Sequence, residues 1–240
     1  MNTSREMFRD RAYDFICGQL MRGELVPGQK LSEHRLAETC GISRTPIHGA
    51  ILRLIEEGIL YQVEKSGTYV ADFSRADILS AYDLREAVET HELAKVIPKL
   101  SARNRRRLDA ECKAMHDCLV ALRNQTDRTP ALETEFLNHD IAFHRIFLNA
   151  AGNPLATKVV LVAYQRNRFF GMLSRQHNLH NVAWAWYYHV KIAKAASCGD
   201  VATAVEWMRI HIRRSQRDAL ARYAQALRQS RGRKTSRALS

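Results

Sequence analysis

Residues 25–60, LVPGQKLSEHRLAETCGISRTPIHGAILRLIEEGIL, decide the fold of the N-terminal part of this chain. Ser32 is suited to cap a short helix, and Gly41 is suited to end it, because glycine readily adopts the left-handed conformation that follows many helices. Ser43 is then suited to cap a further helix over residues 43–57. Two short helices joined by a tight, glycine-containing turn predict a helix-turn-helix.

The second of these helices has an apolar face and a polar start. Its apolar side chains recur at helical spacing and predict the buried face: Ile47, Ile51, Leu54 and Ile55. Arg44, Thr45 and His48 lie at the start and off this face, so we expect them to point outward. Such a helix fits the major groove of DNA, where arginine makes a bidentate contact with guanine and threonine reaches a base edge or methyl group.

A β-hairpin is predicted directly after this helix. Two strand-like stretches, residues 60–63 and 68–71, are joined by the sequence EKSG, with Gly67 at the tip and Lys65 close to it. The hairpin would form a wing that lies along the DNA backbone or in the minor groove. On spacing alone, an ordinary helical subdomain with a hairpin remains the alternative.

Glycine and proline punctuate the first third of the chain and are rare afterwards. An amphipathic helix is predicted over residues 4–22, ended by Gly23, and the scarcity of later breaks predicts long helices. The chain is therefore predicted to be mainly α, in three parts. These are a winged helix-turn-helix over residues 1–72, an all-α bundle of six or seven helices over residues 75–226, and a basic, disordered tail over residues 227–240.

The net charge of +12 does not by itself indicate DNA binding, because of where the charge lies. Residues 1–70 hold nine basic and nine acidic side chains, whereas residues 151–240 hold 16 basic against three acidic. The case for specific DNA binding therefore rests on motif geometry. A protein that coats DNA non-specifically through its basic tail remains an alternative.

Other features of composition favour a folded cytoplasmic protein. The polar N-terminus lacks the apolar region of a signal peptide, and no stretch of about 18 uncharged apolar residues predicts a membrane span. The five cysteines form no CxxC pair, which favours thiols in a reducing compartment over a disulfide framework.

The quoted stretch, followed by the GTYV of the wing, resembles the GntR family of bacterial transcription regulators nearly position by position. The resemblance implies that Arg35 contacts a phosphate or base, that Arg44 and Thr45 read bases, and that Gly67 is the wing glycine. The complete set of predicted DNA-contacting residues is Arg35, Ser43, Arg44, Thr45, His48, Lys65 and Gly67.

The chain departs from the family pattern at His48-Gly49, where the family usually has Arg-Glu. An always-charged, forked donor is thereby replaced by an imidazole that is mostly neutral at pH 7. The operator sequence or the affinity is therefore expected to differ from the family norm. Gly49 inside a helix also costs about 1 kcal/mol relative to alanine.

Metal-ligand residue types recur in the C-terminal part. Asp140 and His144 are four residues apart, which places them on one helical face, and His189 and His211 follow on later helices. Imidazole nitrogen and carboxylate oxygen suit zinc, nickel or manganese. The chain has 10 histidines, however, and surface or core histidines are the alternative interpretation.

Residues 75–222 resemble the all-helical FCD effector domain of the FadR-type branch of the family. The segments that carry the resemblance are Leu84-Arg85 with Val88-Glu89, Asp140 to Arg145, Ala151 to Pro154, and the pair His189 and His211. The resemblance implies a divalent metal, most simply zinc, held by Asp140 and the three histidines at the floor of a cavity, with a small organic acid above it.

Other residues of this domain are candidates for the effector pocket. Arg85 would meet the anionic effector, with a surface helix charge as the alternative; Arg166 and Arg168 are weaker candidates. The aromatic side chains of residues 184–188 either line the pocket or pack between helices.

Together these features predict a homodimeric transcriptional regulator, not an enzyme, that binds operator DNA at half-sites about one turn apart and responds to a small carboxylate-bearing effector. The rival is a metal-dependent small-molecule hydrolase with an N-terminal regulatory domain. The absence of an HExxH motif, a P-loop and a nucleophile elbow from the sequence argues against it.

Overall fold

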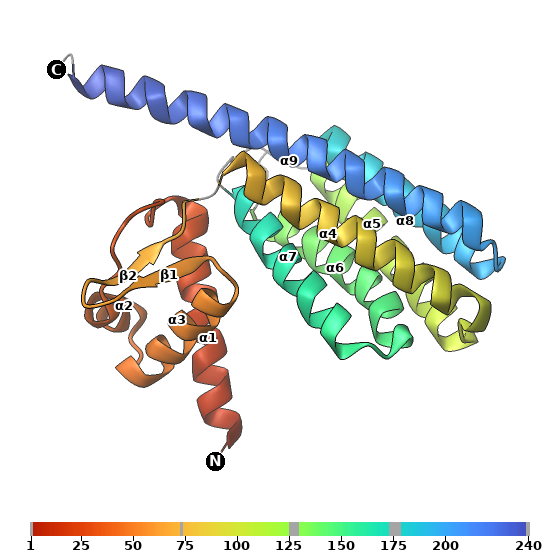
Figure 1. Cartoon of the computed structure of the whole chain (residues 1–240), viewed down its shortest axis with the longest axis horizontal. Coiled ribbons are helices and arrows are strands. Elements are labelled where there is room, and N and C mark those ends of the chain that lie inside the picture. The colour runs from red at the N-terminus through yellow and green to blue at the C-terminus, as the bar shows by residue number, and fades with distance from the viewer. Residues whose placement is uncertain (1, 73, 125–129, 173–178, 239–240) are drawn as a thin grey trace.

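A computed structural model describes residues 2–72, 74–124, 130–172 and 179–238. The N-terminal part comprises α1 (Asn2–Arg22), α2 (Glu33–Cys40), α3 (Arg44–Glu56), β1 (Leu60–Val63) and β2 (Gly67–Val70). The C-terminal part comprises α4 (Arg75–Val96), the 3₁₀ helix η1 (Ile97–Lys99), α5 (Ala102–Asn124), α6 (Pro130–Ala151), α7 (Pro154–Met172), α8 (Leu179–Ser197) and α9 (Val201–Ala238). Figure 1 shows a small head that holds both strands beside a larger helical bundle. The predicted fold class is confirmed.

The helix boundaries of the head follow from local capping. The Ser32 hydroxyl accepts a hydrogen bond from the Arg35 backbone N–H at 3.3 Å, and Gly41 ends α2 with a left-handed φ of 66°. Ser43 occupies the N-cap position of α3 but makes no side-chain capping bond. The predicted N-cap position is therefore confirmed, whereas the capping bond from the side chain is not formed, and Ser43 is exposed.

The three helices of the head share one apolar core. Its fully buried members include Ala12, Ile16, Ile47, Ile51 and Leu54. Phe8, in the first half of α1, is 41% exposed. The hydroxyl of Tyr13 donates to Glu57 at 2.6 Å, and the guanidinium of Arg53 lies 4.0 Å from the centre of the Tyr13 ring. These contacts join α1 to the end of α3.

The wing is a two-stranded antiparallel hairpin in which Leu60 pairs with Val70 and Val63 pairs with Gly67. Lys65 has a φ of 56°, the left-handed conformation that a tight hairpin loop demands. Gly67 has a φ of 123°, and a Cβ there would lie 2.9 Å from Cε of Lys30. The loop therefore depends on glycine at this position, as the sequence predicted.

Replacing Gly49 by alanine is expected to stabilise the protein by about 0.5–1 kcal/mol, because alanine is the better residue in a helix interior. A Cβ at this position would meet Cδ of Arg9 at 3.2 Å, and that exposed, flexible side chain has room to shift. Urea unfolding measures the change. Gly41→Ala is the matched control and should destabilise, since Gly41 has a positive φ; equal losses in both variants would contradict the prediction.

The C-terminal bundle contains six α-helices and one 3₁₀ helix within the described residues. Helix α4 packs against α6, α7 and α9, while α5 packs against α6 and α8. Helix α9 continues to Ala238 and projects beyond the bundle (Figure 1), where the sequence predicted a disordered tail from residue 227. No helix of the described residues combines the length and apolar character needed to span a bilayer.

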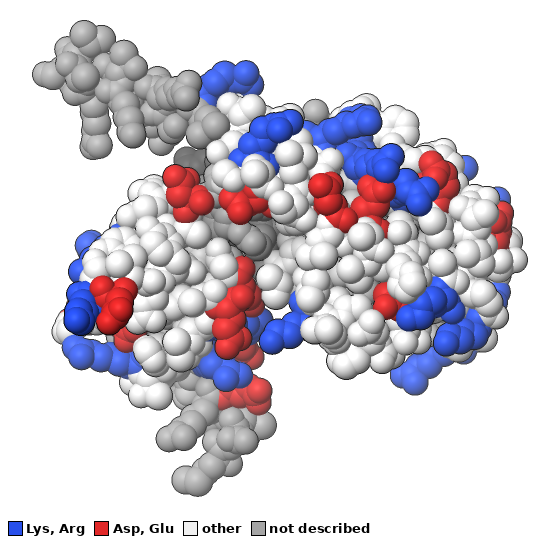
Figure 2. Space-filling view, viewed as in Figure 1, with Lys and Arg blue, Asp and Glu red and all other residues white. Residues whose placement is uncertain are grey.

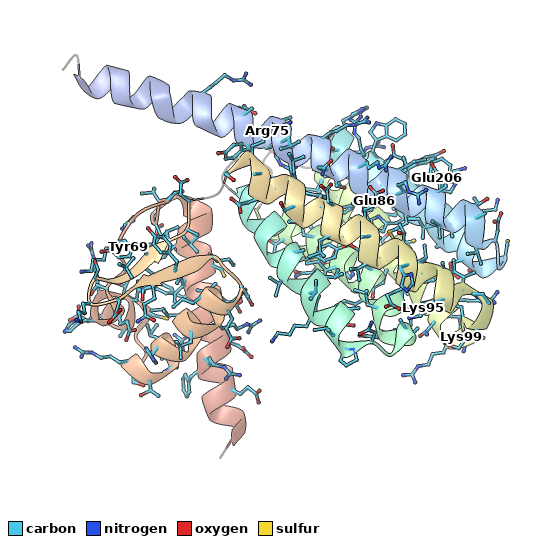
Figure 3. The ribbon with its side chains drawn as sticks, viewed as in Figure 1. Tyr69, Arg75, Glu86, Lys95, Lys99 and Glu206 are labelled. Atoms are coloured by element: carbon cyan, nitrogen blue, oxygen red, sulfur yellow. The ribbon has the colours of Figure 1, made fainter. Side chains whose placement is uncertain are left out.

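Basic side chains of α9 are partly balanced by acidic side chains of α4. Glu86 accepts hydrogen bonds from Arg213 at 2.8 Å and lies 3.3 Å from Arg209, and Figure 3 shows it on the α4 side of this contact. Figure 2 shows blue and red side chains interspersed along this edge of the bundle. The basic surplus of the last third therefore forms no uninterrupted positive face on this edge.

Two features define the junction between head and bundle. Ser74 forms a capping box with Asp77 at the start of α4, which fixes the point where the bundle begins. Helix α1 also contacts α7, and a cleft between head and bundle is lined by side chains of α1, α3, α6 and α7, among them Arg53 and Arg145.

Candidate metal centre and DNA-reading surface

Four potential metal ligands from three helices converge inside the bundle. Asp140 and His144 lie on α6, His189 on α8 and His211 on α9, and their donor atoms all lie within 4.8 Å of one another. Nε2 of His144 lies 3.1 Å from Nε2 of His189 and 3.3 Å from Nε2 of His211. Oδ1 of Asp140 lies 3.3 Å from Nε2 of His189. The structure thus brings together all four residues that the sequence singled out.

Contacts outside the cluster set the proton positions on two of the rings. Nδ1 of His189 donates to the Ala185 carbonyl at 2.6 Å, and Nδ1 of His144 contacts the Glu89 carboxylate. A neutral imidazole that carries its proton on Nδ1 presents a lone pair at Nε2. His144 and His189 therefore direct lone pairs at each other, an arrangement that a cation between them would stabilise.

The electrostatics of the cluster favour neutral rings. Burial lowers the pKa of His189 to about 4, and burial together with the neighbouring histidines lowers the pKa of His211 well below its usual 6.5. The rings of His189 and His211 are therefore unprotonated near pH 7 and are competent as ligands. Three imidazoles and one carboxylate are the donor types that zinc and similar divalent ions accept, so the residues present fit a metal.

The metal-free protein is expected to lose stability as the pH falls from about 6.5 to about 4. The pKa of His189 is lower in the folded chain than in the unfolded chain. Its contribution to the free energy of unfolding is therefore fully present above pH 6.5 and is lost on acidification. The shift corresponds to roughly 3 kcal/mol for this residue. Urea unfolding of chelator-treated protein at several pH values measures the effect. Constant or increasing stability over this interval would contradict it.

Arg85 belongs to a buried ion-pair network beside the cluster. Its Nε donates to Glu89 at 2.7 Å, its Nη2 donates to the Tyr164 hydroxyl, and its guanidinium stacks over the Tyr164 ring at 3.8 Å. Although burial opposes it, the charge of Arg85 and the hydrogen bonds from His144 and Arg85 hold the pKa of Glu89 well below its usual value. Arg85 is only 3% exposed, so it is not the surface charge that the alternative interpretation supposed.

A cavity of about 120 Å³ adjoins the four-donor cluster. Asp140, His211 and Arg85 all contribute to its wall. The remaining polar side chains of the wall come mainly from α8 and α9: Asn181, Ser215, Asp218 and Arg222, with Tyr82, Glu133 and Tyr164 from other helices. The cavity therefore offers a small ligand both the metal-type donors and at least two arginines.

The aromatic side chains of residues 184–188 are absent from the lining of this cavity. Trp184 stacks on Tyr188, and the Trp186 indole donates to the Cys112 carbonyl at 3.1 Å. These contacts agree with packing between helices, which was one of the two interpretations of the sequence. The Arg166 and Arg168 side chains lie outside the described residues.

Most of the predicted DNA-contacting residues on α2, at the start of α3 and in the wing are exposed. Arg35, Ser43, Arg44, Thr45 and Lys65 are all exposed. Ser43 directly precedes α3, and Arg44 and Thr45 are its first two residues.

His48 is also exposed but is held by a neighbour. Its Nδ1 lies 2.9 Å from Oε1 of Glu33 at the start of α2. His48 can therefore contact DNA only if its interaction with Glu33 is broken or shared. The spacing of residues in the sequence did not reveal this interaction.

Several other arginines of the head are paired with acids of the head itself. Arg22 lies 2.6 Å from Glu24, and Arg53 lies 3.2 Å from Asp10. Arg53 also pairs with Glu57 at 3.1 Å. These contacts pair positive charge within the head and agree with its neutral balance.

The sequence alone did not reveal the roles of the residues that surround the four-donor cluster. Glu89 was noted as a point of resemblance without a role, yet it links Arg85 to His144. The spacing of four residues between Arg85 and Glu89 was the available signal. Tyr164 and Arg222 gave no such signal, because only the tertiary packing brings α7 and α9 to the cavity.

Comparison with known proteins agrees with this arrangement. Residues 8–70 match the model of bacterial regulatory proteins of the gntR family, and residues 80–214 match the FCD domain. The chain is 33% identical over 195 residues to an HTH-type transcriptional regulator in an unstable DNA locus of Streptomyces ambofaciens, covering 79% of this chain and 75% of that protein. It is 24% identical to the HTH-type transcriptional regulator LutR of Bacillus subtilis, covering 80% and 92%. The solved structure of McbR/YncC from E. coli superposes with a TM-score of 0.73 at 16% identity, covering 90% and 98%, which reflects a shared fold.

Proposed function

Because the chain belongs to the GntR family of bacterial transcriptional regulators, with an FCD domain as its C-terminal half, we propose that a small carboxylate-bearing effector, bound beside a divalent metal, controls its affinity for operator DNA. The family and the relatives named above are transcriptional regulators rather than enzymes, which leaves the hydrolase alternative without support. One observation carries the effector part of this proposal: the cavity wall includes the metal-type donors Asp140 and His211 together with Arg85.

Helix α3 and the wing would recognise the DNA. Arg44 and Thr45 are exposed at the start of α3, where an arginine reaches guanine in the major groove. Arg35 on α2 and Lys65 at the wing tip would contact the flanking backbone, and the exposed Ser43 hydroxyl adds a further donor. With His48 held by Glu33, the specificity would depend more heavily on Arg44 than in relatives with a second arginine.

The metal would be held by Asp140, His144, His189 and His211. Zinc suits three imidazoles and one carboxylate best, and nickel or manganese accept the same donors. A bound ion would supply positive charge at the cavity floor. Arg85, fixed by Glu89 and Tyr164, would supply a second positive charge on the wall, and together they would favour a small carboxylate.

Two copies of the chain would place their recognition helices in successive major grooves, about 34–36 Å apart on the DNA. Control by the effector requires that it bind one arrangement of the two heads more tightly than another. The contacts of α1 with both α3 and α7, and of α7 with α4, provide a physical connection between the heads and the cavity. We infer that this dimer acts in the cytoplasm.

The test begins with protein purified without chelator. Native mass spectrometry should reveal a dimer that carries a divalent metal and, where one is retained, a small organic acid. Operator fragments selected from the source genome should then bind with an affinity that changes when that acid is added, as measured by fluorescence anisotropy. Selection of no specific fragment would refute the DNA part, whereas an unchanged affinity across a panel of organic acids would refute the effector part alone.

A further inference from the structure

A second group of metal-type donors lies between α5 and α6. It consists of Cys118 on α5 with Glu135 and His139 on α6, and one donor atom from each lies within 4.8 Å of the others. None of these residues belongs to the four-donor cluster or lines its cavity. We propose that Cys118, Glu135 and His139 form a second divalent-metal site of the zinc-binding class, with Glu111 fixing the histidine ring.

The helix geometry explains why these side chains meet. Glu135 and His139 are four residues apart on α6 and therefore share one face, while Glu111 and Cys118 are seven residues, or about two turns, apart on α5. The two helices pack against each other along this face. Oε2 of Glu111 lies 2.7 Å from Nδ1 of His139, which joins the helices and restricts the ring.

The donor set matches the chemistry of zinc. Zinc binds cysteine sulfur at about 2.3 Å and histidine nitrogen or carboxylate oxygen at about 2.0 Å, so its ligand atoms lie roughly 3.3–3.8 Å apart. Donors within 4.8 Å of one another need only small side-chain shifts to reach that spacing. A carboxylate that orients a ligating histidine, as Glu111 orients His139, is a frequent companion of such sites.

The charges at this position also favour a cation. Cys118 is 5% exposed, and burial, with the nearby carboxylates of Glu135 and Asp117, raises the pKa of its thiol. A thiol of this kind stays protonated in the absence of a cation. A divalent ion would offset the negative charge of Glu111 and Glu135 and would stabilise the thiolate, since metal binding releases the thiol proton.

Cobalt(II) is the probe that separates the two sites. A cobalt–thiolate bond gives an intense sulfur-to-metal charge-transfer absorption in the near ultraviolet, and the four-donor cluster contains no sulfur. Chelator-treated, full-length protein titrated with cobalt should develop this band, and its amplitude should saturate at one sulfur-bound cobalt ion per chain. Competition with zinc should remove it.

Matched variants test the assignment. Cys118→Ser should lose the band, whereas Cys112→Ser, buried on the same helix, should keep it. His139→Ala, at a partly exposed position, should weaken cobalt binding at this site at least 10-fold, and Glu111→Gln should weaken it less. A wild-type protein without the band, or a band that persists in folded Cys118→Ser, would overturn the proposal. If Cys118→Ser does not fold, the His139→Ala titration decides, and an unchanged band would overturn the proposal equally.

The proposal of a second site and the proposal of a metal in the four-donor cluster can be refuted independently of each other. His144→Ala, which removes a donor of the four-donor cluster, should leave the sulfur band unchanged. A missing band in protein that still binds one cobalt ion would therefore reject only the second site. A band retained in protein whose four-donor cluster binds no metal would support the second site and count against the proposed effector chemistry.

Discussion

Arg44→Ala is expected to reduce the affinity for the operator about 100-fold or more while leaving the oligomeric state unchanged. Arg44 is exposed at the first position of α3, and a bidentate arginine–guanine contact contributes about 1–3 kcal/mol to discrimination. A dimer loses this contact at both half-sites, so the effect is doubled in free energy. Fluorescence anisotropy with operator and scrambled DNA measures the affinity, and analytical ultracentrifugation measures the oligomeric state.

Lys99→Ala is the control for the loss of one positive charge. Lys99 is exposed at the end of the bundle remote from the head, as Figure 3 shows. Its removal should leave the preference for operator over scrambled DNA intact. If Arg44→Ala also retained that preference, α3 would not be the element that reads the bases.

His144→Ala should lower the affinity for the divalent metal about 100-fold or more. The substitution removes one of four donors and also the contact through which Glu89 orients the ring. Loss of an outer partner alone costs about 10–100-fold in many metal sites, and loss of a donor exceeds that. Competition with a chromophoric chelator measures the affinity.

Thermal unfolding gives a second measurement of the same effect. A ligand present at 100 times its dissociation constant stabilises the folded protein by about 3 kcal/mol, so zinc should raise the unfolding temperature of wild type much more than that of His144→Ala. His91→Ala, at an exposed position of α4, should behave as wild type. Equal stabilisation of all three proteins would show that the four-donor cluster is not the site occupied.

The parts of the structure that depend on contacts between residues close together in the chain could be predicted from the sequence. Ser32 and Gly41 set the ends of α2 through bonds within one or two turns, and the spacing of Asp140 and His144 places both on one helical face. Because these signals involve residues that lie close together in the chain, they can be recognised in the sequence. They also explain why the winged helix-turn-helix was found although the head carries no net charge.

The parts that depend on packing between distant segments could not be predicted in this way. Glu33 holds His48 across two helices, and Arg222 reaches the cavity from α9. Ser43 occupies the N-cap position that the sequence predicts, yet its side chain makes no capping bond. The Glu111–His139 contact similarly exists only because α5 and α6 lie against each other.

The ion pairs that occupy arginines of the head have a consequence for how the protein searches a genome. Contact with arbitrary DNA draws on positive charge alone, and Arg22 and Arg53 already neutralise acids of their own domain. The residence time on non-operator DNA should therefore be shorter, and less dependent on ionic strength, than if these two arginines were unpaired. Discrimination would then come from slow departure from the correct sequence rather than from rapid capture by any duplex.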